Sequence, residues 1–182
     1  GEHIATSEIF MACFFGRYVE AVAKAGRAEY ALPLYTNAAL SRAARQPGQY
    51  PSAGPLPHLI DVWRAASPTI DFLSPDIYFA NFTEWADRYT RSGNPLFIPE
   101  ALRSPDAAVN NLYTFAARDG LGFCPFGIES IAEPAAGMLR ASNDLIRQLT
   151  PLILAHQGKG TMTAMLPPGP DQRQPHAFAL GG

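Results

Sequence analysis

Four short apolar runs alternate with helical patterns along this chain, and this alternation restricts the possible folds more than any other feature. The runs begin near residues 33, 70, 96 and 121, and each is followed by apolar residues at helical spacing. Strands that alternate with helices favour a parallel sheet with right-handed crossover connections. A further helix, which begins near residues 6–7 and ends at Gly26, precedes the first run. The sequence therefore predicts an α/β fold of one helix followed by four strand–helix units.

The number of strand–helix units indicates which α/β fold is present. A complete (β/α)8 TIM barrel needs about 250 residues, so four units in about 155 residues amount to half of one. The alternative is a complete four-stranded open sheet of the flavodoxin type. Two features favour the half-barrel: no strand precedes the first helix to cover its apolar face, and a strand-like alternation begins again at 161–166. We expect the C-terminal half of a barrel over residues 1–158 and the start of a β-rich domain or tail over 159–182.

Composition and charge exclude several classes of partner. The chain has 182 residues, 47% of them hydrophobic, which suits a globular core. Its net charge of -2, without a run of one sign, argues against a nucleic-acid partner. No stretch reaches the roughly 18 consecutive apolar residues of a membrane span. Cys13 and Cys124 lie in apolar runs without metal-site spacing and are predicted to be buried free thiols. They leave the compartment open, with a periplasmic or extracellular location favoured over the cytoplasm.

Elimination of the common catalytic sets leaves carboxylates, amides and aromatic rings as the candidates. The four histidines share no metal-ligand spacing, and neither lysine lies at a predicted strand end. No nucleophile elbow, Walker loop or dinucleotide-binding glycine motif follows a strand. We therefore expect neither a metal nor a cofactor.

Six polar or aromatic residues follow the predicted strands, where a barrel enzyme presents its catalytic groups. They are Asn37 after the first strand, Asp76 and Tyr78 after the second, Glu100 after the third, and Phe126 and Glu129 after the fourth. Carboxylates act on glycosidic bonds, aromatic rings stack on pyranose faces and amides bind hydroxyl groups, so this set suits a carbohydrate substrate. Glu100, at the end of the apolar run 95–100, is the strongest candidate for catalysis.

Each of these residues also has an ordinary structural interpretation. Glu100 would be a surface carboxylate beside a helix, and Asn37 would be an Asx-turn residue. Tyr78 would be a core tyrosine at the edge of the sheet. Asp76 and Glu129 would cap loops or form salt bridges.

Five strings of this sequence together resemble one known enzyme family. They are EIFMACFFGRYVEAVAKAGRAEYALPLYTNAAL, YPSAGPLPHLIDVWRAASPTIDFLSPDIYFANFTEWADRY, GNPLFIPEA, GLGFCPFGIES and LTPLILAHQGKGTM. In combination they resemble bacterial β-galactosidase-type enzymes of glycoside hydrolase family 35, in the branch that carries a domain of unknown function after its barrel. The strings cover nearly the whole chain to about residue 165.

The resemblance implies that the four predicted strands are the fifth to eighth of a (β/α)8 barrel. Glu100 then occupies the place of the family's nucleophile, at the end of the seventh strand. Tyr78 would hydrogen-bond the nucleophile, and Asn37, Phe126 and Glu129 would border the sugar subsite. The family's general acid/base is a Glu in an Asn-Glu pair after the fourth strand, and no such pair occurs in this chain. The implied partner is therefore the N-terminal half of the barrel.

Two further features concern the surroundings of such a site. The Pro/Gly-rich segment 41–57 is far longer than an ordinary connection of about 4–6 residues, and long connections are usually functional. The resemblance places this segment at the rim of the sugar site. Trp63 and Trp85 occur at helical core spacing and are predicted to be packing residues.

The implied activity is that of a retaining β-galactosidase-like glycosidase, which cleaves a terminal β-linked sugar by double displacement. Such an enzyme needs two carboxyl groups about 5–5.5 Å apart, one as nucleophile and one as acid/base. Glu100 supplies only the first, so the chain alone is expected to be inactive and to aggregate or dimerise through an exposed barrel edge. Two alternatives stay open: a catalytically silent carbohydrate-binding or scaffold fragment, and a different barrel hydrolase that uses Asp76 with Glu100.

Overall fold

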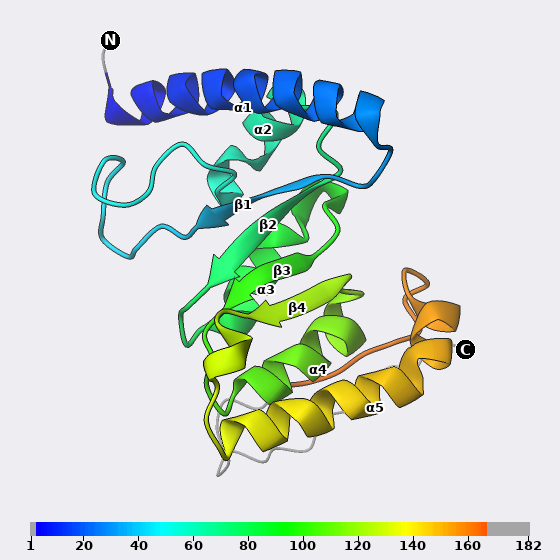
Figure 1. Cartoon of the computed structure of the whole chain (residues 1–182). Coiled ribbons are helices and arrows are strands. Elements are labelled where there is room, and N and C mark those ends of the chain that lie inside the picture. The colour runs from blue at the N-terminus through cyan, green and yellow to red at the C-terminus, as the bar shows by residue number, and fades with distance from the viewer. Residues whose placement is uncertain (1–2, 167–182) are drawn as a thin grey trace.

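The computed structural model describes residues 3–166 and contains one parallel β-sheet flanked by helices (Figure 1). The strands are β1 (Tyr35–Ala39), β2 (Phe72–Ile77), β3 (Phe97–Ala101) and β4 (Gly122–Pro125). They pair in the order β1-β2-β3-β4, and every pair is parallel. Strands that are neighbours in the sheet are therefore consecutive in the chain.

A helix follows each strand, and a long helix precedes the first one. The α-helices are α1 (Ile4–Glu29), α2 (Ile60–Ala66), α3 (Phe82–Tyr89), α4 (Ala107–Arg118) and α5 (Ala135–His156). Three short 3-10 helices are η1 (Pro57–Leu59), η2 (Arg91–Gly93) and η3 (Ile128–Ser130). The α/β fold class predicted from the alternating pattern is confirmed. Within residues 3–166, no helix combines the length and the apolar content that crossing a membrane requires.

The strand order distinguishes between the two architectures that the sequence allows. A doubly wound sheet of the flavodoxin type reverses its strand order at a switch point. A (β/α)8 barrel instead adds each new strand beside the previous one. The sequential order of these four strands is consistent with half of such a barrel. The structure therefore favours the predicted half-barrel over the open sheet.

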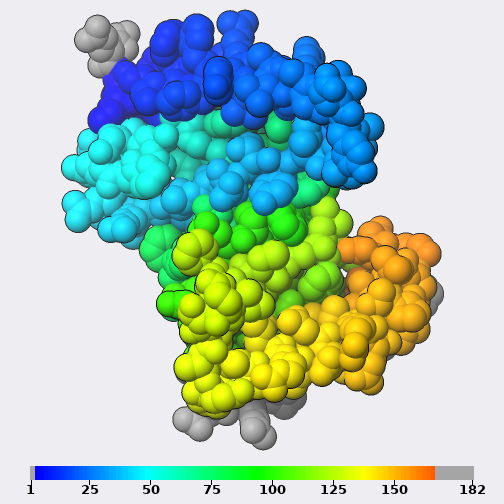
Figure 2. Space-filling view, in the orientation of Figure 1, coloured from blue at the N-terminus to red at the C-terminus, as the bar shows by residue number. Residues whose placement is uncertain are grey.

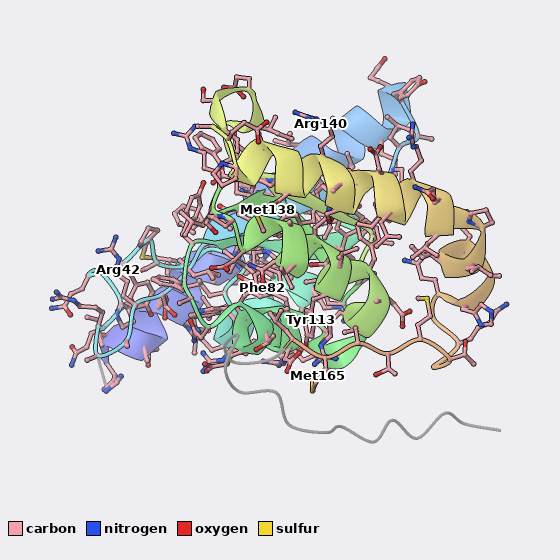
Figure 3. All side chains as sticks on the ribbon, turned by 90° about the horizontal axis from the view of Figure 1, so that it is seen from below. Arg42, Phe82, Tyr113, Met138, Arg140 and Met165 are labelled. Carbon is pink, nitrogen blue, oxygen red and sulfur yellow. The ribbon has the colours of Figure 1, made fainter. Side chains whose placement is uncertain are left out.

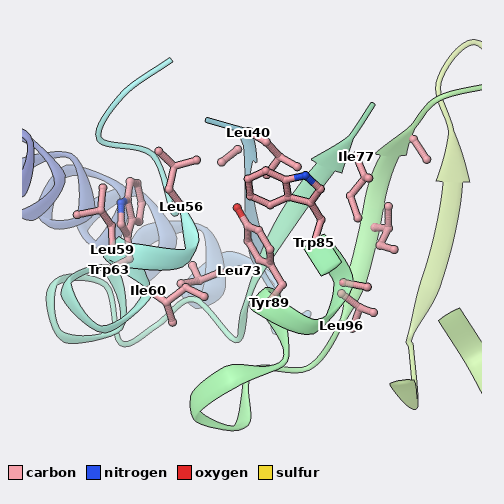
Figure 4. Close-up of a cluster of buried hydrophobic side chains, with 14 of the residues drawn as sticks. Leu40, Leu56, Leu59, Ile60, Trp63, Leu73, Ile77, Trp85, Tyr89 and Leu96 are labelled. Atoms are coloured by element: carbon pink, nitrogen blue, oxygen red, sulfur yellow. The ribbon is translucent and has the colours of Figure 1, made fainter. Parts of the chain in front are cut away.

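The hydrophobic core lies between the sheet and the helices that follow its first two strands (Figure 4). Leu73 and Ile77 of β2 belong to it together with Trp85 of α3 and Trp63 of α2, and all four side chains are buried. The indole Nε1 of Trp63 donates a hydrogen bond to the carbonyl oxygen of Ala53 at 3.0 Å. The prediction that both tryptophans are packing residues is confirmed.

Helices α4 and α5 extend the packing at the other end of the sheet. The ring of Tyr113 from α4 lies edge-on to Phe82 of α3, with 6.3 Å between the ring centroids, and Figure 3 shows the two side chains near each other. Asn111 donates a hydrogen bond from Nδ2 to the Oγ of Ser142 at 3.1 Å, and this hydroxyl donates to the carbonyl oxygen of Ala108 at 2.8 Å. A buried polar contact therefore joins α5 to α4.

Helix α1 packs against α2 and the segments beside it through small and acidic residues and not through its large apolar side chains. Its buried residues are Glu8, Ala12, Gly16, Glu20 and Ala23. The large apolar side chains on its other faces are exposed, among them Phe10, Phe14 and Tyr18, and the helix forms one end of the molecule (Figure 2). Within residues 3–166 no strand precedes α1, so the predicted uncovered apolar face is present in the structure.

The first strand and the last helix differ from the sequence prediction. The strand predicted at 32–37 is β1 at Tyr35–Ala39. The reason is that the side chain of Asp71 accepts the N–H of Leu34 at 2.7 Å, while Pro33 has no N–H to donate to a ladder. Pro151 predicts a break and restart of the helix at 150–151, but α5 continues through Pro151 to His156.

The C-terminal segment and the cysteines differ as well. Residues 161–166 form no regular secondary structure, although a strand is predicted there, and Leu166 packs against the core. The rest of the predicted β-rich domain or tail, 167–182, lies outside the described residues. Cys13 is partly buried and Cys124 is exposed, and both are free thiols. The prediction of a buried thiol is wrong for Cys124, because this residue lies on β4, the last strand of the sheet.

Candidate functional site

Four of the six candidate residues meet at the edge of the sheet where the parallel strands end. Asn37 hydrogen-bonds Asp76, Tyr78 hydrogen-bonds Glu100, and Asp76 and Glu100 are partners in the register of β2 and β3. Asn37 lies in the middle of β1, opposite Ser74, and not after the strand as predicted. This correction follows from the later end of β1 at Ala39, which places the residue inside the ladder.

Glu100 is the penultimate residue of β3, and its side chain is held by a tyrosine. The phenol Oη of Tyr78 donates a hydrogen bond to Oε2 of Glu100 at 3.0 Å. Burial raises the pKa of Tyr78 to about 12, and the hydrogen bond to Glu100 and the charges of Glu100 and Asp76 act in the same direction. The phenol therefore keeps its proton at neutral pH and stays a hydrogen-bond donor to the carboxylate.

A register irregularity in β3 explains why Glu100 is not on the core side of the sheet. Successive residues of a strand point to opposite faces, so Glu100 would share the face of Ile98 in a regular strand. Ile98 and Ala101 are both buried in the core, and the pairing of β3 with β4 shifts between these two residues. Pro99 lies in this stretch and has no N–H for the ladder. The irregularity leaves Glu100 beside Tyr78.

Asp76 is a buried carboxyl group next to Glu100. It is only 8% exposed, and its Oδ1 and Oδ2 accept hydrogen bonds from Nδ2 of Asn37 at 2.8 and 2.9 Å. Burial raises the pKa of Asp76, the hydrogen bond from Asn37 opposes this shift, and the negative charge of Glu100 adds to it. A buried and a partly buried carboxyl group therefore lie on neighbouring strands.

The other two candidates are close to the strand ends but make no recorded polar contact with Glu100. Phe126 follows β4, is 58% exposed, and donates its backbone N–H to the carbonyl oxygen of Ala101 at 3.0 Å. Glu129 is exposed in η3. Sequence reasoning missed Arg103, whose Nη1 donates to the carbonyl oxygen of Gly127 at 3.2 Å and whose charge acts on Tyr78. Its only sequence signal is its position three residues after Glu100.

The long segment after β1 is anchored by a buried acid that sequence reasoning also missed. Glu8 of α1 is 3% exposed. It accepts hydrogen bonds from the phenol of Tyr50 at 3.1 and 3.2 Å and from the backbone N–H of Ala53 at 3.2 Å. The Nε2 of His58 lies 2.9 Å from its Oε2. Segment 41–57 begins at the same edge of the sheet as Glu100, and its exposed part includes Arg42 (Figure 3).

The chemistry of this site comes from carboxyl, phenol and amide groups. Among the described residues, no three His, Cys, Asp or Glu side chains gather to form a metal site. A carboxylate held by a phenol at the end of a strand is suited to nucleophilic attack, and a second carboxyl beside it acts on it through its charge. Comparison with known proteins finds no family model and no curated protein that matches this chain.

Proposed function

We propose that this chain is part of a retaining, β-galactosidase-like glycosidase in which Glu100 is the nucleophile. The observation that carries the proposal is the hydrogen bond from Tyr78 to Glu100 at the carboxyl edge of a parallel half-barrel. The resemblance of the sequence to glycoside hydrolase family 35 supports the same assignment. The substrate is a carbohydrate with a terminal β-linked sugar, and the reaction requires no cofactor.

The proposed reaction proceeds by double displacement. An Oε atom of Glu100 attacks the anomeric carbon, the bond from this carbon to the leaving oxygen breaks, and a general acid protonates that oxygen. The same group, now a base, takes a proton from water, which attacks the anomeric carbon of the glycosyl ester and releases Glu100 as a carboxylate. Tyr78 orients the carboxylate for attack, because its phenol keeps its proton at neutral pH. Phe126, being exposed near the strand end, offers a ring for stacking on the sugar.

The acid/base carboxyl is proposed to come from a second half-barrel. In the family that the sequence resembles, this residue follows an Asn, and the chain contains no Asn-Glu pair. A second set of four strands would pair with the free edges of β1 and β4 and close the barrel. The working site would then bring the two carboxyl groups to about 5–5.5 Å.

The experiment that tests the nucleophile is Glu100→Gln in the protein that contains both halves. Hydrolysis of nitrophenyl β-galactoside is expected to fall by about 10³-fold or more, because the amide cannot form the glycosyl ester. The control is Glu84→Gln, an exposed acid of α3, which is expected to keep full activity. Addition of azide to Glu100→Ala is expected to restore turnover as glycosyl azide. Wild-type hydrolysis by Glu100→Gln would show that the assignment is wrong.

A second candidate is a hydrolase that uses Asp76 together with Glu100. The register of β2 and β3 favours it, because neighbouring strands are about 4.8 Å apart, close to the carboxyl separation of a retaining pair. An activity assay of the isolated 182-residue chain distinguishes the two candidate functions. Hydrolysis by the isolated chain supports the Asp76–Glu100 pair, whereas activity only after addition of the other half supports the first proposal. A full-length protein without hydrolysis but with sugar binding would indicate a silent carbohydrate-binding scaffold.

A further inference from the structure

Asp76 lacks the partner that a buried acid usually has. No Lys, Arg or His forms an ion pair with it among residues 3–166, although eight other ion pairs occur there. Its hydrogen bonds come from the amide of Asn37 alone. The interpretation of Asp76 as a salt-bridging acid is therefore wrong. The ionisable residue opposite it in the sheet is Glu100, its register partner on β3.

The groups around Asp76 carry no positive charge that would stabilise its ionised form. Asn37 faces it from β1, Glu100 from β3 and Tyr78 from the end of β2. Burial raises the pKa of the Tyr89 phenol on α3, and the negative charge of Asp76 raises it further. The positive charge of Arg103 acts on Tyr78. Ionised Asp76 and ionised Glu100 therefore repel each other in a partly desolvated place, where the interaction is stronger than in water.

We propose that Asp76 is a positioning residue whose negative charge makes Glu100 a better nucleophile. The inference rests on the proposed function. When Glu100 forms the glycosyl ester, the charge on its oxygen passes into a covalent bond and the repulsion from Asp76 disappears. The ionised Asp76 therefore favours the glycosylation step and also the positive charge that develops on the sugar ring. No proton moves to or from Asp76 in this step, and Asn37 keeps its carboxylate in place.

The first test measures the coupling of the two carboxyl groups without any reaction. Carbon-13 NMR follows the side-chain carboxyl of Asp76 through a pH titration of the protein with both halves, in the absence of substrate. Asp76 is expected to titrate at a higher pH than an ordinary Asp, because it is buried and faces Glu100. In Glu100→Gln its midpoint is expected to move to lower pH, since the like charge is gone. A midpoint that does not move would overturn the inference.

The second test measures the consequence for catalysis in the protein with both halves. Asp76→Asn keeps the shape and removes the charge. Its kcat for nitrophenyl β-galactoside is expected to fall about 10-fold at nearly constant KM, and the acid limb of its pH profile should move to lower pH. The matched control, Asp87→Asn, removes an exposed acid of α3 and should keep the wild-type profile. If Asp76→Asn kept the wild-type kcat and the wild-type pH profile, the charge of Asp76 would have no role in the reactivity of Glu100.

The two tests separate this inference from the proposed function. If Glu100→Gln remains fully active while the midpoint of Asp76 still depends on Glu100, the nucleophile assignment is wrong and the carboxyl pairing stands. If Glu100→Gln is inactive while the titration midpoint of Asp76 is the same with and without the Glu100 carboxyl, Glu100 remains the proposed nucleophile. The proposed electrostatic coupling between Asp76 and Glu100 is then wrong. Because the titration compares wild type with Glu100→Gln, it does not require the Asp76 variant to fold.

Discussion

At the scale of single residues, buried polar groups in this protein divide into those with partners and those without. Both polar groups of the Asn94 side chain are hydrogen-bonded. Its Nδ2 donates to the carbonyl oxygens of Leu73 and Tyr89 at 2.8 Å each, and its Oδ1 accepts the N–H of Leu73 at 2.9 Å. Ser74, one residue further along β2, is completely buried, and its Oγ has no hydrogen-bond partner among residues 3–166. A buried hydroxyl without a partner costs stability.

Ser74→Ala is therefore expected to leave the free energy of unfolding unchanged or to raise it by about 0.5–1 kcal/mol. The control is Ser142→Ala, because the Oγ of Ser142 donates to Ala108 and accepts from Asn111. That variant is expected to lose about 1–2 kcal/mol, since it leaves buried partners unpaired. Urea denaturation monitored by circular dichroism measures both values. If Ser74→Ala lost more free energy of unfolding than Ser142→Ala, the hydroxyl of Ser74 could not be the one without a hydrogen-bond partner.

At the scale of secondary-structure elements, α1 is attached by small residues and by two buried acids. Gly16 lets α1 approach α2 closely, because a Cβ on this residue would lie 2.6 Å from the Cβ of Ala66. The carboxylate of Glu20 accepts the backbone N–H and the hydroxyl of Thr69 at 2.8 and 2.9 Å. Glu8 accepts hydrogen bonds from the segment after β1. The contact of α1 thus depends on close approach and on polar pairing.

Gly16→Ala is expected to reduce the free energy of unfolding by about 1–3 kcal/mol, because the added methyl group overlaps Ala66 and forces the helices apart. Gly26→Ala provides a control in the same helix, since no atom lies within 4 Å of its added Cβ. That variant is expected to stabilise the protein by about 0.5–1 kcal/mol through helix propensity. Thermal unfolding of the two variants should give shifts of opposite sign. If Gly16→Ala stabilised the protein as much as Gly26→Ala does, α1 and α2 could not be in close contact at Gly16 and Ala66.

At the scale of the whole molecule, large apolar surfaces lie exposed. On α1, Phe10 is 62% and Tyr18 is 72% exposed, and Phe14 lies one turn from each. Strands β1 and β4 are the outer strands of the sheet, so each has one free edge within the described residues. Monomeric proteins rarely expose such apolar patches or free edges without a partner. A second half-barrel would cover both.

The chain alone is therefore expected to associate at micromolar concentration. Sedimentation velocity should detect dimers or larger species, because the exposed rings of α1 and the strand edges attract other copies. Phe10→Glu combined with Phe14→Lys should weaken the association while the circular dichroism spectrum stays the same. Leu152→Glu, on the exposed face of α5, serves as the control and should have a smaller effect. A wild-type chain that stays monomeric would contradict the half-barrel proposal.

Part of the fold and of the site is readable from local sequence. The apolar runs predict the four strands because a strand buried between helices needs apolar residues, and Leu73, Ile77 and Ile98 occupy such places. The Tyr78–Glu100 contact was implied by the family resemblance, and the parallel strands bring both residues to one edge of the sheet. The pairing of Asn37 with Asp76 was not predicted, because it depends on the register of β1 against β2.

The sequence by itself determined the α/β class, the order of strands and helices, and the presence of Glu100 near a strand end, because these depend on periodicity and on short connections. The tertiary structure alone decided the face to which Glu100 points, the burial of Asp76 and the polar attachment of α1. These features depend on register shifts and on contacts between segments far apart in the chain. Such contacts leave no periodic signal, because each is made by one or two residues whose partners are set only when the sheet and helices pack.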